Sequence, residues 1–310
     1  MLRNCRTARV AVHSGSIPWM IYLGAGLLAL AAFLASPMAA RAQDVRPNRI
    51  IIQYIAPTNP EQQPVYEMVQ QHRMLEQFQE IFSPFLLRMD VNLVTKTCDM
   101  DNAWYQRPTM TICYEYLQSI QKSLPSDPPP ANMTRSDLVL GQVFYVVAHE
   151  MGHAMFDQLN VPLFGRAEDA ADGFATYMML KLGKKQARRL IGGAAYSYKD
   201  YIKNPKVTVP TTAFSDAHGA PMQRFYNLLC LAYGANRETY ADLIDLGYLP
   251  KERAVSCPME YGELNYAFQQ LVVPQLDKTL AKQVLEKDWV PPATSGNAAP
   301  EARASDMPSK

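Results

Sequence analysis

Two histidines and a glutamate lie within five residues of one another and have side chains suited to metal-dependent chemistry. His149 and His153 are four residues apart, so on a helix they project from the same face and can share one metal ion. Glu150 directly follows the first histidine, where it can act as a general base on a metal-bound water. The flanking residues 146–148 and 154–155 are uncharged, as a buried helix requires. The spacing therefore predicts a zinc site on a buried helix rather than two packed histidines beside an exposed glutamate.

A zinc site needs a third protein ligand, and the acidic residues downstream can supply it. A histidine six residues after His153 would be one such ligand, but Leu159 occupies that position. The first acidic cluster beyond the motif contains Glu168, Asp169 and Asp172. Glu168 and Asp172 share a helix face, so Glu168 can complete the ligand set while Asp172 accepts a hydrogen bond from the outer nitrogen of a ligand histidine. A role for Asp169 or Asp172 as the ligand is the alternative, and the helix dipole alone would also favour acids here.

These two elements, in this order, resemble the gluzincin metallopeptidases, which are the thermolysin-type zinc enzymes. The resemblance implies a zincin-like fold, a zinc ion held by His149, His153 and Glu168, and Asp172 as the partner of a ligand histidine. The segment between the two elements is shorter here than in thermolysin. Metzincins, which use a third histidine, are excluded because Phe156 also replaces the glycine that their motif requires.

Two further segments resemble the same enzymes. Asn102 and Ala103, followed by two aromatic residues, resemble the segment that holds the substrate backbone along an edge strand, so the resemblance implies that they bind substrate. It also implies a residue above the metal that stabilises the oxyanion, which His218 can provide, with Arg224 or Tyr226 as alternates. The alternative for His218 is an exposed histidine in a loop.

The chain also resembles a bacterial family of exported metallopeptidases that carries only a provisional label. This resemblance implies a fold and a metal, and it says very little about the substrate. It rests on three stretches that together account for most of residues 46–290, namely Cys98–Glu115, His149–Ala175 and Arg224–Cys257.

The spacing of apolar residues predicts the elements that position these side chains. Strands are predicted over residues 49–55, 86–94 and 110–116, and the last of them is expected to align the substrate. Helices are predicted over residues 61–82, from an N-cap at Ser136 to Leu159, and over residues 167–182. A Pro-rich loop spans residues 124–130, and the later chain is helical with breaks at Gly192-Gly193, 205–210, Gly234 and 247–250.

This order of elements predicts an α+β protein with two lobes. Residues 43–160 form a mixed α/β sheet lobe that ends in the active-site helix, and residues 161–290 form a mainly helical lobe. Together with the resemblance to gluzincins, this layout implies a zincin-like fold. Residues 291–310 are rich in Pro, Ala and Ser with few large apolar residues, so we expect a disordered tail.

The first 42 residues differ in kind from the rest of the chain. Arginines precede the apolar run Ile21–Leu34, and Ala40-Arg41-Ala42 then places small residues where a signal peptidase reads. We therefore predict a signal peptide at residues 1–42 and an exported protein, periplasmic or secreted, with no stable membrane span after cleavage. Because the apolar run is shorter than the about 20 residues of a spanning helix, an uncleaved membrane anchor is the lesser alternative. A translation start at Met20 is also compatible with the sequence.

Composition describes a soluble globular protein, with 48% hydrophobic residues, 19% charged residues and a formal net charge of +1. No stripe of Lys and Arg is visible, which argues against a nucleic-acid partner. Residues 1–42 contain four arginines and no acids, so their removal leaves a net charge of about −3.

Four cysteines remain once residues 1–42 are removed, and an even number in an exported protein predicts two disulfides. Proximity in the sequence favours Cys98–Cys113 and Cys230–Cys257, although four cysteines allow three pairings. A zinc site made of four thiolates is the competing interpretation, but the cysteines lack the two-residue spacing that such sites prefer.

The motif specifies hydrolytic chemistry more firmly than it specifies a substrate. The leading hypothesis is a zinc metallopeptidase that acts on a peptide or protein substrate. Two other hypotheses stay open, a non-catalytic zinc-containing binding protein and a zinc hydrolase of a non-peptide amide or ester. The oligomeric state does not follow from the sequence.

Overall fold

The computed structural model describes residues 45–125, 133–203 and 208–292. They belong to one compact unit that begins at Gln43. The predicted signal peptide, most of the predicted tail and part of the Pro-rich loop lie outside the described residues. Across the described ranges, no helix combines the length and apolar character needed to cross a membrane.

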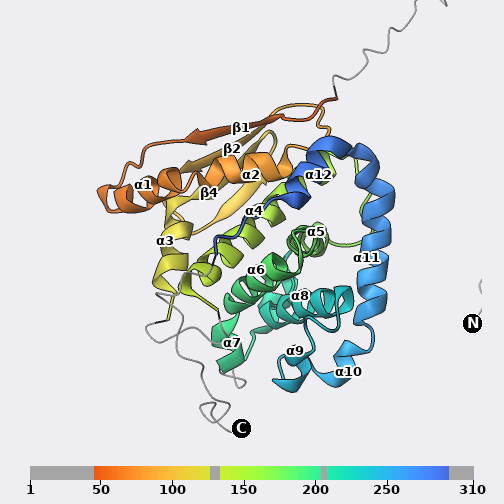
Figure 1. The fold of residues 1–310 in the computed structure, drawn as a ribbon. Helices are drawn as coiled ribbons and strands as arrows, with labels where there is room; N and C mark the ends of the chain where they lie inside the picture. Colours follow the sequence, from red (N-terminus) through yellow and green to blue (C-terminus); the bar gives the residue numbers. More distant parts are fainter. Residues whose placement is uncertain (1–44, 126–132, 204–207, 293–310) are drawn as a thin grey trace, which may run out of the picture. The chain divides into compact units, whose positions relative to one another are not determined.

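A four-stranded sheet of mixed direction lies on one side of this unit (Figure 1). Its order is β1-β2-β4-β3, in which β1, β2 and β4 run parallel and β3 pairs antiparallel with β4 at the edge. The strands are β1 (Ile50–Tyr54), β2 (Val91–Lys96), β3 (Ala103–Gln106) and β4 (Thr109–Cys113). With the helices described below, the sheet makes this a mixed α and β protein, which is compatible with the predicted α+β class.

Two predicted strands need correction. The strand predicted over residues 86–94 begins only at Val91, because Leu87 forms an isolated bridge with Arg46 instead. The strand predicted over residues 110–116 is interior: β4 lies between β2 and β3, and the chain enters helix α3 (Tyr114–Lys122) directly after it. β3 forms one edge of the sheet and β1 the other, and the four residues of β3 are too few for alternation to reveal in a sequence.

Two helices cover the same face of the sheet. α2 (Met74–Phe82) packs against β1 and β2, while α4 (Arg135–Leu159) packs against β3 and β4. The rings of Phe78 in α2 and Phe144 in α4 lie 5.6 Å apart, so the two helices meet. The two helices and the sheet therefore enclose a shared apolar core.

The helix predicted over residues 61–82 is two helices in the structure. α1 (Gln63–Gln71) ends at His72, and Arg73 then adopts a left-handed conformation with φ of 51°. An arginine in this conformation leaves no signal in the sequence pattern. His72, which we expected at the surface or in packing, is exposed at this junction.

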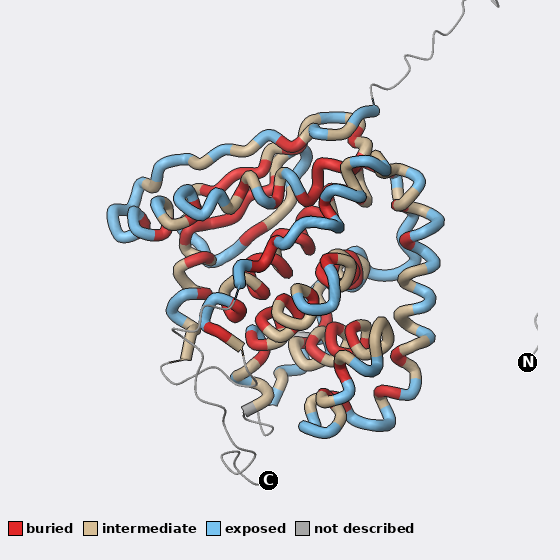
Figure 2. Tube along the Cα trace, viewed as in Figure 1, coloured by how far each residue is buried: buried red, intermediate tan, exposed pale blue. Residues whose placement is uncertain are grey.

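α4 is the central helix of the unit. It begins after Thr134 rather than Ser136, because Thr134 and Asp137 form a reciprocal capping box. The sheet, α5 (Ala167–Lys181) and α6 (Lys184–Tyr196) all pack against it. Figure 2 shows the result, a helix that is buried along most of its length.

The predicted break at Gly192-Gly193 is wrong, because α6 continues through both residues. A Cβ atom at Gly193 would lie 2.1 Å from the carbonyl oxygen of Asp137 and 2.9 Å from the Cα atom of Gly141. Gly193 and Gly141 therefore mark the place where α6 crosses α4 backbone against backbone, whereas Gly192 faces the side chain of Met133, and neither glycine of α6 marks a helix end.

The remaining helices complete the later part of the unit. They are α7 (Lys199–Lys203), α8 (Pro221–Ala235), α9 (Asp242–Asp245), α10 (Lys251–Ala254), α11 (Cys257–Leu271) and α12 (Lys278–Glu286). α8 packs against α5 and α11, and the predicted break at Gly234 falls in its last turn. After α11 the chain returns to the beginning of the unit, where the amide of Leu86 donates to the carbonyl of Gln275 at 2.9 Å.

Two cysteine pairs lie at disulfide distance and pair as sequence proximity predicts. Cys98 and Cys113 have Cα atoms 5.5 Å apart, and their bond ties the segment before β3 to the end of β4. Cys230 and Cys257 have Cα atoms 4.9 Å apart and join α8 to α11. Both separations fall in the usual range for disulfides.

Candidate metal centre

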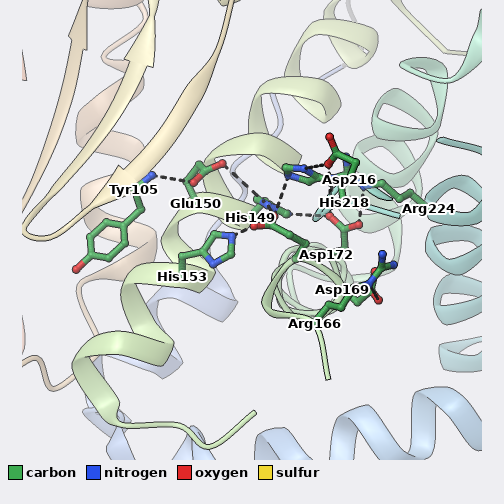
Figure 3. A network of polar contacts seen from close by, with 11 residues as sticks. Tyr105, His149, Glu150, His153, Arg166, Asp169, Asp172, Asp216, His218 and Arg224 are labelled. Carbon is green, nitrogen blue, oxygen red and sulfur yellow. Dashed lines mark hydrogen bonds and ion pairs between the residues drawn. The ribbon is translucent and has the colours of Figure 1, made fainter. Parts of the chain in front are cut away.

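His149 and His153 of α4 face the beginning of α5 (Figure 3). The first turn of α5 carries Glu168. One carboxylate oxygen, Glu168 Oε2, is 3.0 Å from His149 Nε2 and 3.3 Å from His153 Nε2. The two imidazole rings have centroids 5.0 Å apart. The structure thus brings together the three residues that the sequence analysis assigned as metal ligands.

Asp172, one helical turn after Glu168, accepts a hydrogen bond at Oδ1 from His149 Nδ1 at 2.8 Å. This contact orients the His149 ring so that its Nε2 atom points to Glu168. Arg224 of α8 donates two hydrogen bonds to the same Asp172 carboxylate, each at 2.7 Å. Arg224 therefore lies behind Asp172 as its counter-ion. Tyr226 packs on Phe225, with ring centroids 5.3 Å apart.

His218 enters the same cluster from the loop before α8. Its Nε2 atom is 2.8 Å from Glu168 Oε2, and its ring stacks on His149 at a centroid distance of 5.8 Å. Its Nδ1 atom is 3.1 Å from Asp216 Oδ1. The side chain is 45% exposed, so His218 forms the solvent side of the cluster.

Glu150 is buried and turns the other way, towards the sheet edge (Figure 3). Its Oε2 atom accepts a hydrogen bond from the backbone amide of Tyr105 in β3 at 2.9 Å. Its Oε1 atom is 4.0 Å from His149 Nε2. Glu150, the candidate general base, therefore lies between His149 and the edge strand.

The edge strand presents part of its backbone to this site. The Cys113 amide donates to the Asn102 carbonyl, and antiparallel partners alternate in bonding, so Trp104 also bonds to β4. Ala103 and Tyr105 then direct their backbone groups outward, which agrees with the bond from Tyr105 to Glu150. The predicted substrate residues thus lie at the start of the edge strand, where Asn102 precedes it and is exposed and Ala103 is its first residue and is buried.

Asp157 of α4 connects that helix to β3 and to the turn after it, a contact that the sequence did not predict. Asp157, one turn after His153, accepts hydrogen bonds from the Tyr105 hydroxyl at 2.8 Å and from Arg107 Nε at 2.6 Å. It holds the edge strand against the helix that carries Glu150. Its spacing of four residues from His153 was the available signal, because this spacing places it on the same helix face.

The charges of the cluster are strongly coupled. Burial lowers the pKa of His149, but hydrogen bonds to Asp172 and Glu168 outweigh it and raise the value to about 9. The bond to His149 lowers the pKa of Glu168 to about 2. Burial raises the pKa of Asp172, yet its bonds to His149 and Arg224 bring it well below the usual range. Burial raises the pKa of Glu150 to about 7, against the opposing effect of the His149 charge.

The donor atoms suit a metal of the zinc type. Imidazole nitrogens and a carboxylate oxygen are ligands that zinc accepts, and in a tetrahedral site with bonds of about 2.0–2.1 Å the ligand atoms lie about 3.3 Å apart. The distances from Glu168 Oε2 to the histidine nitrogens are close to this value or slightly shorter. A second group with metal-binding atoms, Cys98, Cys113 and Glu115, is unsuited because its two sulfur atoms form a disulfide.

A helix that carries two histidines and a glutamate, completed by a carboxylate from the next helix, has the arrangement of a metallopeptidase active site. Residues 54–272, more than half of the chain, match the family described as "Putative metallopeptidase", and the chain belongs to this family. No curated protein matches the chain, and no solved structure does. Membership of a metallopeptidase family implies a bound metal, and the described residues contain a group that could hold one, formed by His149, Glu168 and His218. His153 lies outside this group, although its Nε2 atom is 3.3 Å from Glu168 Oε2.

Proposed function

We propose that this protein is a zinc-dependent metallopeptidase in which His149, His153 and Glu168 hold the ion. The observation that carries the proposal is the convergence of imidazole nitrogens on Glu168 Oε2, with Asp172 bonded to the outer nitrogen of His149. A ligand histidine held by a carboxylate is the usual support of a catalytic zinc site. Zinc, when bound, polarises a carbonyl group and lowers the pKa of a water molecule.

Glu150 is proposed as the general base of the reaction. Its pKa of about 7 lets the carboxylate accept a proton from water at neutral pH and pass that proton to the leaving amine. The Tyr105 amide holds Oε2, which leaves Oε1, on the side of His149, for the water. Proton transfer of this kind contributes about 10²- to 10⁴-fold to a rate.

The free edge of β3 is proposed as the place where the substrate lies. An extended peptide can pair with outward-facing backbone groups of an edge strand, and Ala103 offers such groups next to Glu150. Pairing with the edge strand needs the repeating backbone groups of a peptide, so it favours a peptide substrate over a non-peptide amide or ester. Asn102, exposed at the start of the strand, is proposed to hold the same peptide.

Export is part of the proposal. The sequence pattern of residues 1–42 and the two disulfides both support a protein that matures outside the cytoplasm. We therefore expect the mature chain to begin after Ala42 and to meet its substrate in the periplasm or the medium.

The direct test of this mechanism is Glu150→Gln, compared with Glu67→Gln, which alters an exposed carboxylate on α1. Glu150→Gln keeps all three ligands, so it should bind zinc as the unaltered protein does. Its cleavage of a peptide library should fall by about 10²- to 10⁴-fold, while Glu67→Gln should cleave normally. Equal cleavage by both variants would show that Glu150 is not the base. Zinc binding without cleavage by the unaltered protein would favour a non-catalytic binding protein.

A further inference from the structure

His218 shares the arrangement of a metal ligand with His149. In each residue Nε2 points to Glu168 Oε2, at 2.8 Å for His218 and 3.0 Å for His149. In each residue Nδ1 lies against an aspartate, which is Asp216 for His218 and Asp172 for His149. A carboxylate on the outer nitrogen orients a histidine whose inner nitrogen binds metal. A histidine that is merely exposed on a loop does not require a carboxylate at each of its two ring nitrogens, as His218 has.

The positions of the donor atoms support the same interpretation. The potential ligand atoms of His149, Glu168 and His218 all lie within 4.8 Å of one another. His153 lies outside this group and joins the cluster through Glu168, whose Oε2 atom is 3.3 Å from His153 Nε2, so nitrogens of three imidazoles approach one carboxylate oxygen. We propose that His218 is a fourth protein ligand of the metal, with Asp216 as the residue that positions it.

The loop that carries His218 is held on the helix turn that carries Glu168. Gly219 is buried against the ion pair of Arg166 and Asp169, and a Cβ atom there would lie 3.2 Å from Arg166 Nη2 and 3.5 Å from Asp169 Oδ1. This close approach places the neighbouring His218 over Glu168. The position of the ring therefore follows from packing of the loop and from the bond to Asp216.

Four protein ligands have a consequence for the reaction. They fill a tetrahedral zinc site, whereas a catalytic site keeps one position open for water or substrate. His218 is the most exposed of the four ligands and the only one on a loop, so it is the ligand that leaves. The resting protein is then a closed form, which opens when His218 moves off. This inference rests on the metal site of the proposed function.

The test measures metal binding without reference to activity. Zinc affinity is determined by competition with a chromophoric chelator, and X-ray absorption of the zinc-loaded protein counts the bound imidazoles. The variants are His218→Ala, Asp216→Asn and, as a control, His72→Ala, which alters an exposed histidine at the α1–α2 junction. Thermal unfolding of each metal-free variant, compared with the unaltered protein, shows that the variants fold.

We expect three imidazoles on the zinc in the unaltered protein and in His72→Ala, and two in His218→Ala. Zinc affinity should fall at least tenfold in His218→Ala and in the same direction, by a smaller factor, in Asp216→Asn, since partners of ligands contribute about 10- to 100-fold. Equal affinity and two imidazoles in the unaltered protein and His218→Ala would overturn the inference alone. Failure of the unaltered protein to bind zinc would overturn the proposed function as well, and the first titration shows this before any variant is compared.

Discussion

At the scale of single residues, Glu168 Oε2 is the atom on which the site converges. Nitrogens of His149, His153 and His218 approach it, and Asp172 supports the first of them from behind. The spacing of His149 and His153 predicted that they share one helix face. In the structure this face lies against Glu168. Asp216 could not be assigned from the sequence, because its partner lies in a loop whose path no periodicity describes.

The coupling between His149 and Asp172 predicts how stability of the metal-free protein depends on pH. The pKa of His149 is about 9, above the value of 6.5 for an unpaired histidine. Because the pKa is raised in the folded protein, the pairing contributes its full stabilisation below the unfolded-state pKa of 6.5. This stabilisation is lost as the pH rises through the folded-state pKa of about 9. The contribution is on the order of 3 kcal/mol at about pH 6.

The measurement is thermal unfolding in the presence of a chelator, for the unaltered protein and His149→Gln. We expect the unaltered protein to be the more stable at about pH 6 and the difference between the two midpoints to shrink towards about pH 10. A difference that stays constant over this range would show that His149 is not held as its charged form.

At the scale of elements, α4 decides the geometry of the site. It carries two of the proposed ligands and the proposed base, and the sheet, α5 and α6 hold it in place. Its capping box at Thr134 and its contact with Gly193 of α6 are both visible in the structure. The sequence predicted the helix but not its crossing with α6. A glycine can mark either a close crossing of two helices or a break in one helix, and the sequence does not distinguish the two.

The crossing of α4 and α6 predicts opposite effects for two Gly→Ala substitutions. Gly193→Ala places a methyl group against the Asp137 carbonyl, so we expect a loss of about 1–3 kcal/mol in the free energy of unfolding. Gly262→Ala in α11 meets no atom within 4 Å, so we expect a gain of about 0.4–1 kcal/mol. Urea unfolding of both variants measures these values. If Gly193→Ala were as stable as Gly262→Ala, the helices would not cross as closely as described.

At the scale of the whole molecule, the part of the chain that matches the metallopeptidase family, residues 54–272, contains β2, β3, β4, α4, α5 and the His218 loop. The helix that carries His149 and His153 and the favoured disulfide pairing could be predicted from spacing and proximity along the chain. The edge strand and the link that Asp157 makes to it could not, because they depend on contacts between residues about 45 to 52 positions apart. Sequence patterns describe local periodicity, whereas the side of the site formed by β3 is built from contacts between residues far apart in the sequence.

The most direct test of the central claim is the metal dependence of peptide cleavage. The mature protein, purified without added metal, is analysed for bound zinc and then incubated with a peptide library before chelation, after chelation and after zinc is returned. We expect about one zinc per chain, cleavage that stops on chelation and cleavage that resumes with zinc. Absence of bound metal, or cleavage that continues unchanged in the chelator, would contradict the assignment of this protein as a zinc metallopeptidase.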